Sequence, residues 1–169
     1  RRLVSGGGHR CGRPTGLDEP AMARLTGAAP VGEPAIEGAA RVGVGVDLQP
    51  AWLYLDARTL TAQFGDARLE YFIPLRSLFE AGVVAGGGSD HMQKIGSLRS
   101  VNPYNPFLGM WITVTRTARW HDTPIHPEQA LTREQMIRFY TINNAYLMRA
   151  ETEIGSLEPG KRADFVVID

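Results

Sequence analysis

A carboxylate and an imidazole, Asp90 and His91, follow three consecutive glycines in the middle of the chain. The short apolar run before the glycines, residues 82–85, is long enough for one buried strand. The glycines, Gly86 to Gly88, predict a sharp turn with an accessible backbone. A strand that ends in a carboxylate at a loop is typical of the carboxyl-terminal face of a (β/α)8 barrel, where it holds a metal ligand or a general base. The alternative is an Asx-turn, in which Asp90 only caps the loop.

A second strand end lies upstream. Residues 42–48 form a valine-rich run of strand length. The run stops at Gln49 because Pro50 cannot continue a central strand. Gln49 therefore occupies the carboxyl end of a strand, as Asp90 does. Residues 51–55, which are apolar and aromatic, are expected to form a loop.

The segment between the two strands predicts a helix near residues 68–81. Pro74 suits the first turn of a helix, and Gly82 stops it. Strand, loop, helix and strand make one βα repeat and the start of the next. The valine-rich strands do not alternate in polarity, which suits burial on both faces. We therefore expect adjacent parallel strands near 42–48 and 82–87.

Parallel neighbours bring their carboxyl ends to one edge of a sheet, where barrel enzymes carry their active sites. Gln49, Asp90 and His91 are therefore expected at the same end of the two strands. Trp52 and part of the long connection 92–120 should lie close to them. Connections of this length are usually binding loops or lids.

The segments outside these two strands carry sequence signals of different strength for secondary structure. Residues 1–34 show no sustained period and predict an irregular arm. Residues 35–41 predict the end of a helix closed by Gly43. Further along, His121 and His126 lie in a polar stretch with prolines, where exposed loop histidines are at least as good a reading as catalytic ones.

The best-marked helix is expected from Thr132 to Ala150. Thr132 and Gln135 have the spacing of a capping box at its start. Asn143 and Asn144 are poor helix formers in its interior, and we expect their side chains to bond neighbouring backbone.

Composition bounds the class of protein. The 169 residues are 43% hydrophobic and 21% charged, which suits one globular domain. Lys and Arg balance Asp and Glu at 18 each, so nothing indicates a nucleic-acid partner. No apolar run approaches the roughly 20 residues of a membrane helix. The single cysteine, Cys11, and the lack of an apolar leader favour a cytoplasmic protein.

Four segments resemble the metal-dependent amidohydrolase superfamily, in its amidohydrolase family 3 branch. The most specific is the tail Gly155-Ser156-Leu157-Glu158-Pro159-Gly160-Lys161-Arg162-Ala163-Asp164-Phe165-Val166-Val167. In the family, this pattern marks the return from the barrel to a small β-sandwich. The others resemble the seventh barrel strand and its loop, the end of the eighth strand and the helix after it: Val46 to Trp52, Gly88-Ser89-Asp90, and Thr132 to Tyr146.

The resemblance runs from about residue 35 to 169. It implies an α/β fold, the carboxyl-terminal part of a (β/α)8 TIM-type barrel over 35–150, with its last two strands and their helices. It also implies that 151–169 begin the return to a β-sandwich, so that 165–168 form a strand. Residues 1–34 show no family match.

The family implies a mechanism. Its members hold one or two divalent metals, often zinc, which acidify a bound water. The strand-eight carboxylate, here Asp90, takes the water's proton, touches metal, and later protonates the leaving nitrogen. The resemblance thus implies a hydrolase of carbon–nitrogen bonds in small amide or N-acyl substrates. Gln49, Trp52 and His91 are the residues expected to contact substrate.

The family's H-x-H pair and its middle-strand histidine ligands do not occur in these 169 residues. We therefore expect a carboxyl-terminal fragment that lacks most metal ligands, holds no metal and is inactive alone. Open sheet edges would favour self-association. The alternatives are a non-catalytic truncated product that pairs with another chain and an unrelated α/β interaction module.

Overall fold

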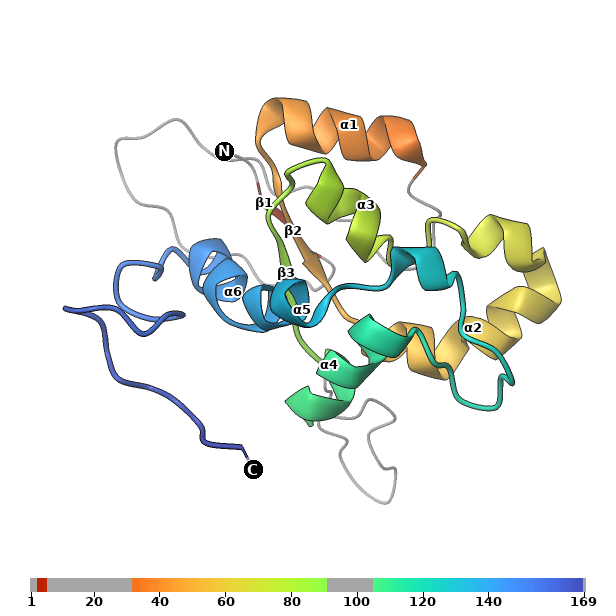
Figure 1. Ribbon diagram of the computed structural model, residues 1–169. Helices are drawn as coiled ribbons and strands as arrows, with labels where there is room; N and C mark the ends of the chain where they lie inside the picture. Colours follow the sequence, from red (N-terminus) through yellow and green to blue (C-terminus); the bar gives the residue numbers. More distant parts are fainter. Residues whose placement is uncertain (1–2, 6–31, 91–104, 169) are drawn as a thin grey trace, which may run out of the picture.

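The computed structural model describes residues 3–5, 32–90 and 105–168. At the centre of these residues lies a three-stranded parallel sheet in the order β1-β2-β3 (Figure 1). The strands are β1 (Leu3–Ser5), β2 (Gly45–Leu48) and β3 (Ala85–Gly87). β2 and β3 pair with Asp47 opposite Gly86. This confirms the prediction of adjacent parallel strands near 42–48 and 82–87.

Helices follow and surround the strands. They are α1 (Glu33–Val42), α2 (Ala51–Phe64), α3 (Leu75–Glu80), α4 (Pro106–Thr115), α5 (Arg133–Tyr140) and α6 (Ile142–Leu147), with 3-10 turns η1 (Asp66–Leu69) and η2 (Pro127–Gln129). In Figure 1, β2 and β3 run from the end near α1 and α3 toward the end near α2 and α4. α5 and α6 contact β3.

The core joins the sheet to these helices. Its fully buried members include Val46, Ala85, Leu53, Leu78 and Phe139. They come from two strands and three helices that are far apart in sequence, so burial of apolar surface binds these elements together. None of the described helices is long and apolar enough to cross a membrane.

The helix end predicted at 35–41 is confirmed, whereas the helix predicted for 68–81 is confirmed only over residues 75–80. α1 ends at Gly43, whose left-handed φ of 66° allows its N–H to bond the helix's last carbonyls. α3 lies inside the helix predicted for 68–81, and η1 begins just before that range. The predicted loop at 51–55 is wrong, because α2 begins at Ala51. Pro50 both ends β2 and starts the helix, with the Leu53 N–H donating to its carbonyl at 3.0 Å.

The helix predicted for 132–150 is divided. Its capping box is confirmed, since the Gln135 N–H donates to Thr132 Oγ1 and Gln135 Oε1 accepts from the Thr132 N–H. The chain then breaks between α5 and α6 at Thr141, whose φ and ψ are −123° and −95°. The Thr141 hydroxyl donates to the Ile137 carbonyl at 2.6 Å, a local bond that competes with helix continuation.

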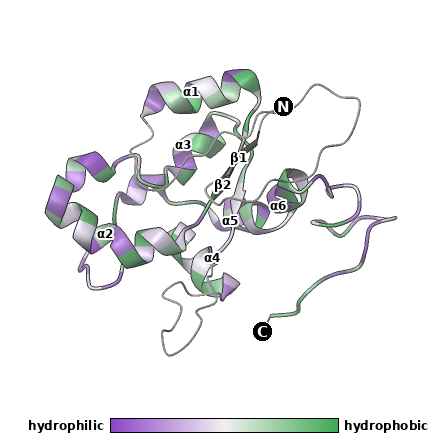
Figure 2. Ribbon diagram, turned by 180° about the vertical axis from the view of Figure 1, so that it is seen from behind, coloured by the Kyte–Doolittle hydropathy of each residue, from purple (hydrophilic) through white to green (hydrophobic). Residues whose placement is uncertain are grey.

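The ends of the chain differ from the sequence expectations. β1 lies within the predicted irregular arm 1–34; three residues are too few to show a period, and their pairing with β2 makes them a strand. Residues 165–168 were predicted as a strand, which is wrong: their side chains are 67% to 83% exposed. A strand needs a hydrogen-bonded neighbour, and none of the described segments lies beside them. In Figure 2 this tail stands away from the sheet.

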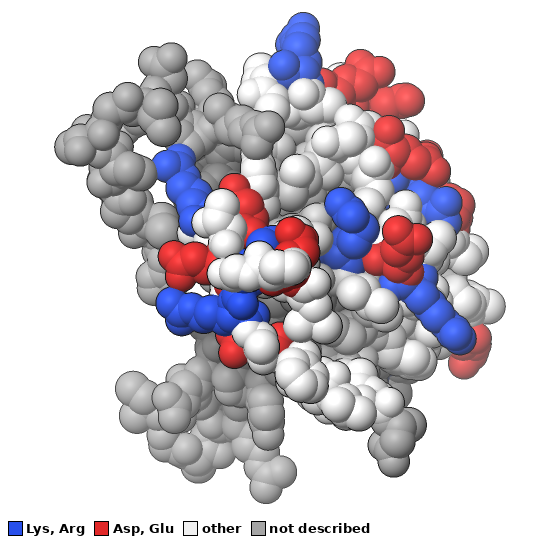
Figure 3. Space-filling view, turned by 60° about the vertical axis from the view of Figure 1, so that its left-hand side comes forward, with Lys and Arg blue, Asp and Glu red and all other residues white. Residues whose placement is uncertain are grey.

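Charges of both signs lie next to one another over the face shown in Figure 3. Ion pairs join Lys161 to Glu158 at 3.4 Å and Arg162 to Glu153 at 3.0 Å. The Arg162–Glu153 pair is exposed on both sides, and a pair of this kind is worth little stability.

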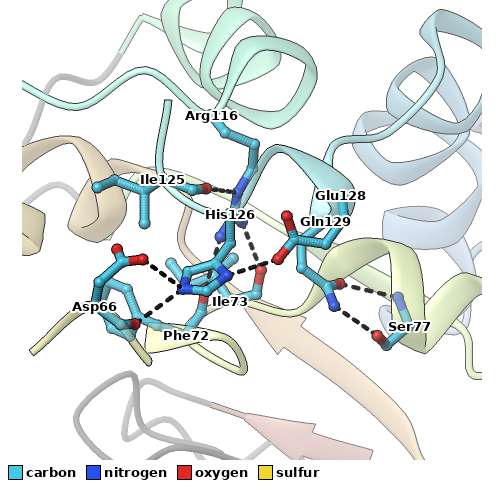
Figure 4. A network of polar contacts seen from close by, with 9 residues as sticks. All are labelled: Asp66, Phe72, Ile73, Ser77, Arg116, Ile125, His126, Glu128 and Gln129. Atoms are coloured by element: carbon cyan, nitrogen blue, oxygen red, sulfur yellow. Dashed lines mark hydrogen bonds and ion pairs between the residues drawn. The ribbon is translucent and has the colours of Figure 1, made fainter. Parts of the chain in front are cut away.

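A polar network holds the two 3-10 turns together (Figure 4). His126 Nδ1 lies 2.6 Å from Glu128 Oε1, and its Nε2 lies 2.9 Å from the carbonyl oxygen of Asp66. Partial burial opposes the charged imidazolium, but hydrogen bonds and charges from Asp66 and Glu128 outweigh it and raise the pKa of His126. The sequence left an exposed and a catalytic role open for His126; in the structure it is a partly buried residue that bonds η2 to η1.

The contacts of His126 with Asp66 and Glu128 predict that the stability of the fold depends on pH. A raised folded-state pKa adds stability below the unfolded value of about 6.5, and this stability is lost as pH rises through the folded pKa. His126→Asn keeps a residue that tolerates the left-handed φ of 46° but carries no charge. Urea unfolding at pH 5.5 should show a loss of about 0.5–1 kcal/mol in this variant, of the size of a modest ion pair.

The same comparison at pH 8 should show a smaller loss. His121→Asn is the matched control, because His121 Nδ1 contacts only Thr123 in the described contacts. An equal loss for His126→Asn at both pH values would contradict a stabilising role for the charged form of His126.

Candidate functional site

The carboxyl ends of β2 and β3 bring two of the expected site residues into contact. Trp52, in the first turn of α2, donates from its indole Nε1 to Asp90 Oδ2 at 3.1 Å. Asp90 follows β3 by three residues and has a left-handed φ of 47°. Asn and Asp tolerate this conformation better than most residues. The turn thus occurs at Asp90, and the prediction that the glycines make it is wrong: Gly86 and Gly87 lie within β3.

A further carboxyl joins the group. The pKa of Asp47 is raised to about 6: burial is the main cause, a hydrogen bond with the Gln49 side chain opposes it, and the negative charge of Asp90 adds to the rise. Asp47 therefore lies close enough to Gln49 to form a hydrogen bond and close enough to Asp90 to feel its charge. The sequence analysis missed Asp47, because the valine-rich run around it indicated only a buried strand. The signal that was available is a lone acid in that run, two residues before Gln49.

The structure thus gathers Gln49, Trp52 and Asp90 at one end of the strands. His91 and residues 92–104 lie outside the described residues. Beyond them, α4 contacts α2, and the Trp111 ring meets the Tyr54 ring edge-on at 6.4 Å. Part of the connection 92–120 is therefore helical, as α4, and packs against the helix that carries Trp52.

The described carboxylates supply only part of what a divalent metal needs. Carboxylate oxygens such as those of Asp90 and Asp47 are accepted ligands of zinc, but a catalytic zinc takes three protein ligands. The described residues contain no group of three or more His, Cys, Asp or Glu placed to hold a metal. They fit the carboxylate part of such a site and not the whole of it.

The profile of the amidohydrolase family matches residues 12–169. The chain belongs to the amidohydrolase family. This confirms the resemblance found in the sequence and extends it further toward the amino terminus than residue 35, where the sequence analysis began it. Much of the supposed unmatched arm therefore falls within the family match.

Two curated proteins are similar to this chain. An N-substituted formamide deformylase from Arthrobacter pascens is 36% identical over 96 residues, which cover 57% of the chain and 16% of that protein. "Putative amidohydrolase YtcJ" from Bacillus subtilis is 28% identical over 135 residues, 79% of the chain and 24% of that protein. The chain spans about a quarter or less of the length of these relatives.

Two solved structures share the fold. Both are uncharacterized metal-dependent hydrolases, from Pyrococcus horikoshii and Pyrococcus furiosus, with TM-scores of 0.64 and 0.60 and 22% identity. Each likeness covers 80% of the chain, and 26% and 25% of the other protein. The described sheet and helices therefore follow the architecture of one part of these larger proteins.

Proposed function

We propose that this chain supplies the carboxyl-terminal part of a (β/α)8 barrel in a metal-dependent hydrolase of carbon–nitrogen bonds. The observation that carries the proposal is Asp90, oriented by Trp52 and beside Asp47 and Gln49 at the carboxyl end of parallel strands. In barrel enzymes this is where catalytic groups stand. Membership of the amidohydrolase family supports hydrolysis as the type of reaction.

Asp90 acts as general base and then general acid. It takes a proton from the attacking water as the new carbon–oxygen bond forms, and gives it to nitrogen as the carbon–nitrogen bond breaks. The products are a carboxylic acid and an amine. Asp90 would be one ligand of a divalent metal, zinc by the family resemblance, which when bound would supply an acidified water and polarise the substrate carbonyl.

The neighbours of Asp90 fix its geometry. The Trp52 N–H donates to Oδ2 and thereby fixes the orientation of the Asp90 carboxyl group. Gln49 carries both a donor and an acceptor for a substrate amide. We assign Gln49, Trp52 and His91 to substrate contact. Small N-acyl amines, including N-substituted formamides, are the substrate class we propose, since one relative is named for that activity.

The test compares the 169-residue chain with the full protein, meaning the longest product of its reading frame. Each is loaded with zinc and given a panel of N-substituted formamides and N-acetyl amines, and released amine is measured. We expect amine release by the full protein, its loss on adding chelator and its return with zinc. The 169-residue chain should bind less than one equivalent of zinc and release no amine.

A zinc-loaded full protein that hydrolyses none of the panel would overturn the proposed function. Chelator-sensitive turnover by the 169-residue chain alone would instead show that the expectation of an inactive fragment is wrong.

A further inference from the structure

The two asparagines of α6 lie along the free edge of β3. Asn143 Nδ2 donates to the Ala85 carbonyl at 2.7 Å, and Asn144 Nδ2 donates to the Gly87 carbonyl at 2.9 Å. Asn144 Oδ1 also accepts from the Gly87 N–H at 2.7 Å. The expectation that these side chains bond neighbouring backbone is confirmed, and the backbone is that of β3.

These bonds satisfy backbone N–H and carbonyl groups of β3 that do not bond to β2. Across the β2–β3 pair, the Val46 N–H donates to the Val84 carbonyl at 2.9 Å. Backbone groups of successive residues in a strand point to opposite edges, so those of Ala85 and Gly87 point away from β2. The Asn144 side-chain amide uses one N–H and its oxygen to bond the carbonyl and the N–H of Gly87, as the backbone of a neighbouring strand would.

The glycines permit this close approach. A Cβ at Gly86 would collide with the Asn144 side chain, and one at Gly87 would collide with the Leu48 carbonyl oxygen. Glycine in a strand interior often marks such an approach of another group. Contact with α6 and β2 thus explains Gly86 and Gly87, whereas a Cβ at Gly88 would meet nothing within 4 Å.

Asn144 therefore holds one end of a short segment whose other end carries the carboxylate. Gly87 is fixed on both its backbone groups by Asn144, and three residues later Asp90 is fixed by Trp52. A small shift of Gly87 would move Asp90 relative to Trp52, because so short a link cannot absorb it.

We infer that Asn144 is a positioning residue that sets the place of Asp90 by clamping both backbone groups of Gly87. Its effect on turnover rests on the proposed function, whereas its effect on the geometry of Asp90 does not. A misplacement of about 1 Å can cost roughly 10²-fold in rate. Asn144 variants should therefore lose kcat with little change in KM.

The test uses Asn144→Asp in the full protein. This change keeps the size and one acceptor but sets an oxygen against the Gly87 carbonyl, so the clamp is lost. The matched control is Asn143→Asp, on the same helix, which loses a bond to Ala85, five residues before Asp90. The full protein is labelled with 5-fluorotryptophan, and the Trp52 resonance is identified by its absence in Trp52→Phe.

We expect Asn144→Asp to shift the Trp52 fluorine resonance and lower kcat about 10²-fold. Asn143→Asp should destabilise the protein similarly yet leave that resonance near its original position. Asn144→Ser, which keeps a smaller hydroxyl donor, should stay folded and give an intermediate shift. It serves as the deciding variant if Asn144→Asp does not fold.

An unchanged Trp52 resonance in a folded Asn144 variant would overturn the inference, whatever happens to turnover. Equal shifts in the Asn143 and Asn144 variants would overturn it too, because general packing of α6 would then explain both. Failure of the proposed function is recognised separately, by the absence of amine release in the unaltered full protein.

Discussion

Replacing Asp90 by Asn is expected to remove most of the turnover of the full protein while leaving its fold nearly intact. The amide has the shape of the carboxylate, and it still accepts a hydrogen bond from Trp52 through its oxygen. It cannot take a proton from water, however. Loss of a positioned general base typically costs about 10²–10⁴-fold.

The measurement is kcat with zinc-loaded protein, together with the circular dichroism spectrum and zinc content of each variant. The matched control is Asp122→Asn, which removes an exposed carboxyl from the connection after α4. It should retain the rate of the unaltered protein. Unaltered turnover in Asp90→Asn would remove Asp90 from the mechanism and favour its role as a simple loop cap.

Where strand pairing follows from local pattern, the sequence predicted it correctly. The valine-rich run that stops at Pro50 contains β2, and the apolar run before Gly86 ends in Ala85, the first residue of β3. The parallel pairing brings the ends that carry Gln49 and Asp90 to one edge of the sheet, where Trp52 bonds Asp90. This worked because proline and strand length are local signals.

Other features depend on contacts between distant segments, and the sequence did not show them. Asp47 has a raised pKa because burial and the charge of Asp90 act on it together, and neither is visible in its neighbours. The Asn144 clamp joins residues 57 apart. A side chain of this type predicts only that it will bond some backbone, and the partner comes from the fold.

Arg116 makes the most extensive of the contacts that the sequence did not show. It follows α4 with a left-handed φ of 56° and is fully buried. Its guanidinium donates to the carbonyls of Ile125 at 2.9 Å, Ile73 at 2.7 Å and Phe72 at 3.0 Å (Figure 4). It thereby joins the end of α4 to the segment between η1 and α3 and to the segment just before η2. Nothing in its local sequence distinguishes it from a surface arginine.

The charge of Arg116 persists despite its burial. Burial lowers the pKa of its guanidinium to about 10, against the attraction of Glu128, which raises it. The group is therefore protonated at neutral pH. A buried charge is tolerated when it is paired or fully hydrogen-bonded, and here three carbonyl oxygens accept from it.

Arg116→Met is accordingly expected to cause the largest loss of stability of any single change considered, about 3–5 kcal/mol. Methionine fills part of the space but leaves the carbonyls of Phe72, Ile73 and Ile125 without their donor. Urea unfolding of the 169-residue chain, followed by circular dichroism, measures the loss. Arg116→Lys should fall between, because one ammonium cannot reproduce the spread of the guanidinium fork.

Arg119→Met provides the matched control three residues away. Arg119 is exposed and its guanidinium lies 3.9 Å from the centre of the Trp120 ring, so its loss should change stability by about 0.5 kcal/mol or less. If Arg116→Met were no more destabilising than Arg119→Met, the three carbonyl bonds would not hold these segments together. The packing of Phe72, Ile73 and Ile125 in the hydrophobic core would then have to account for their arrangement.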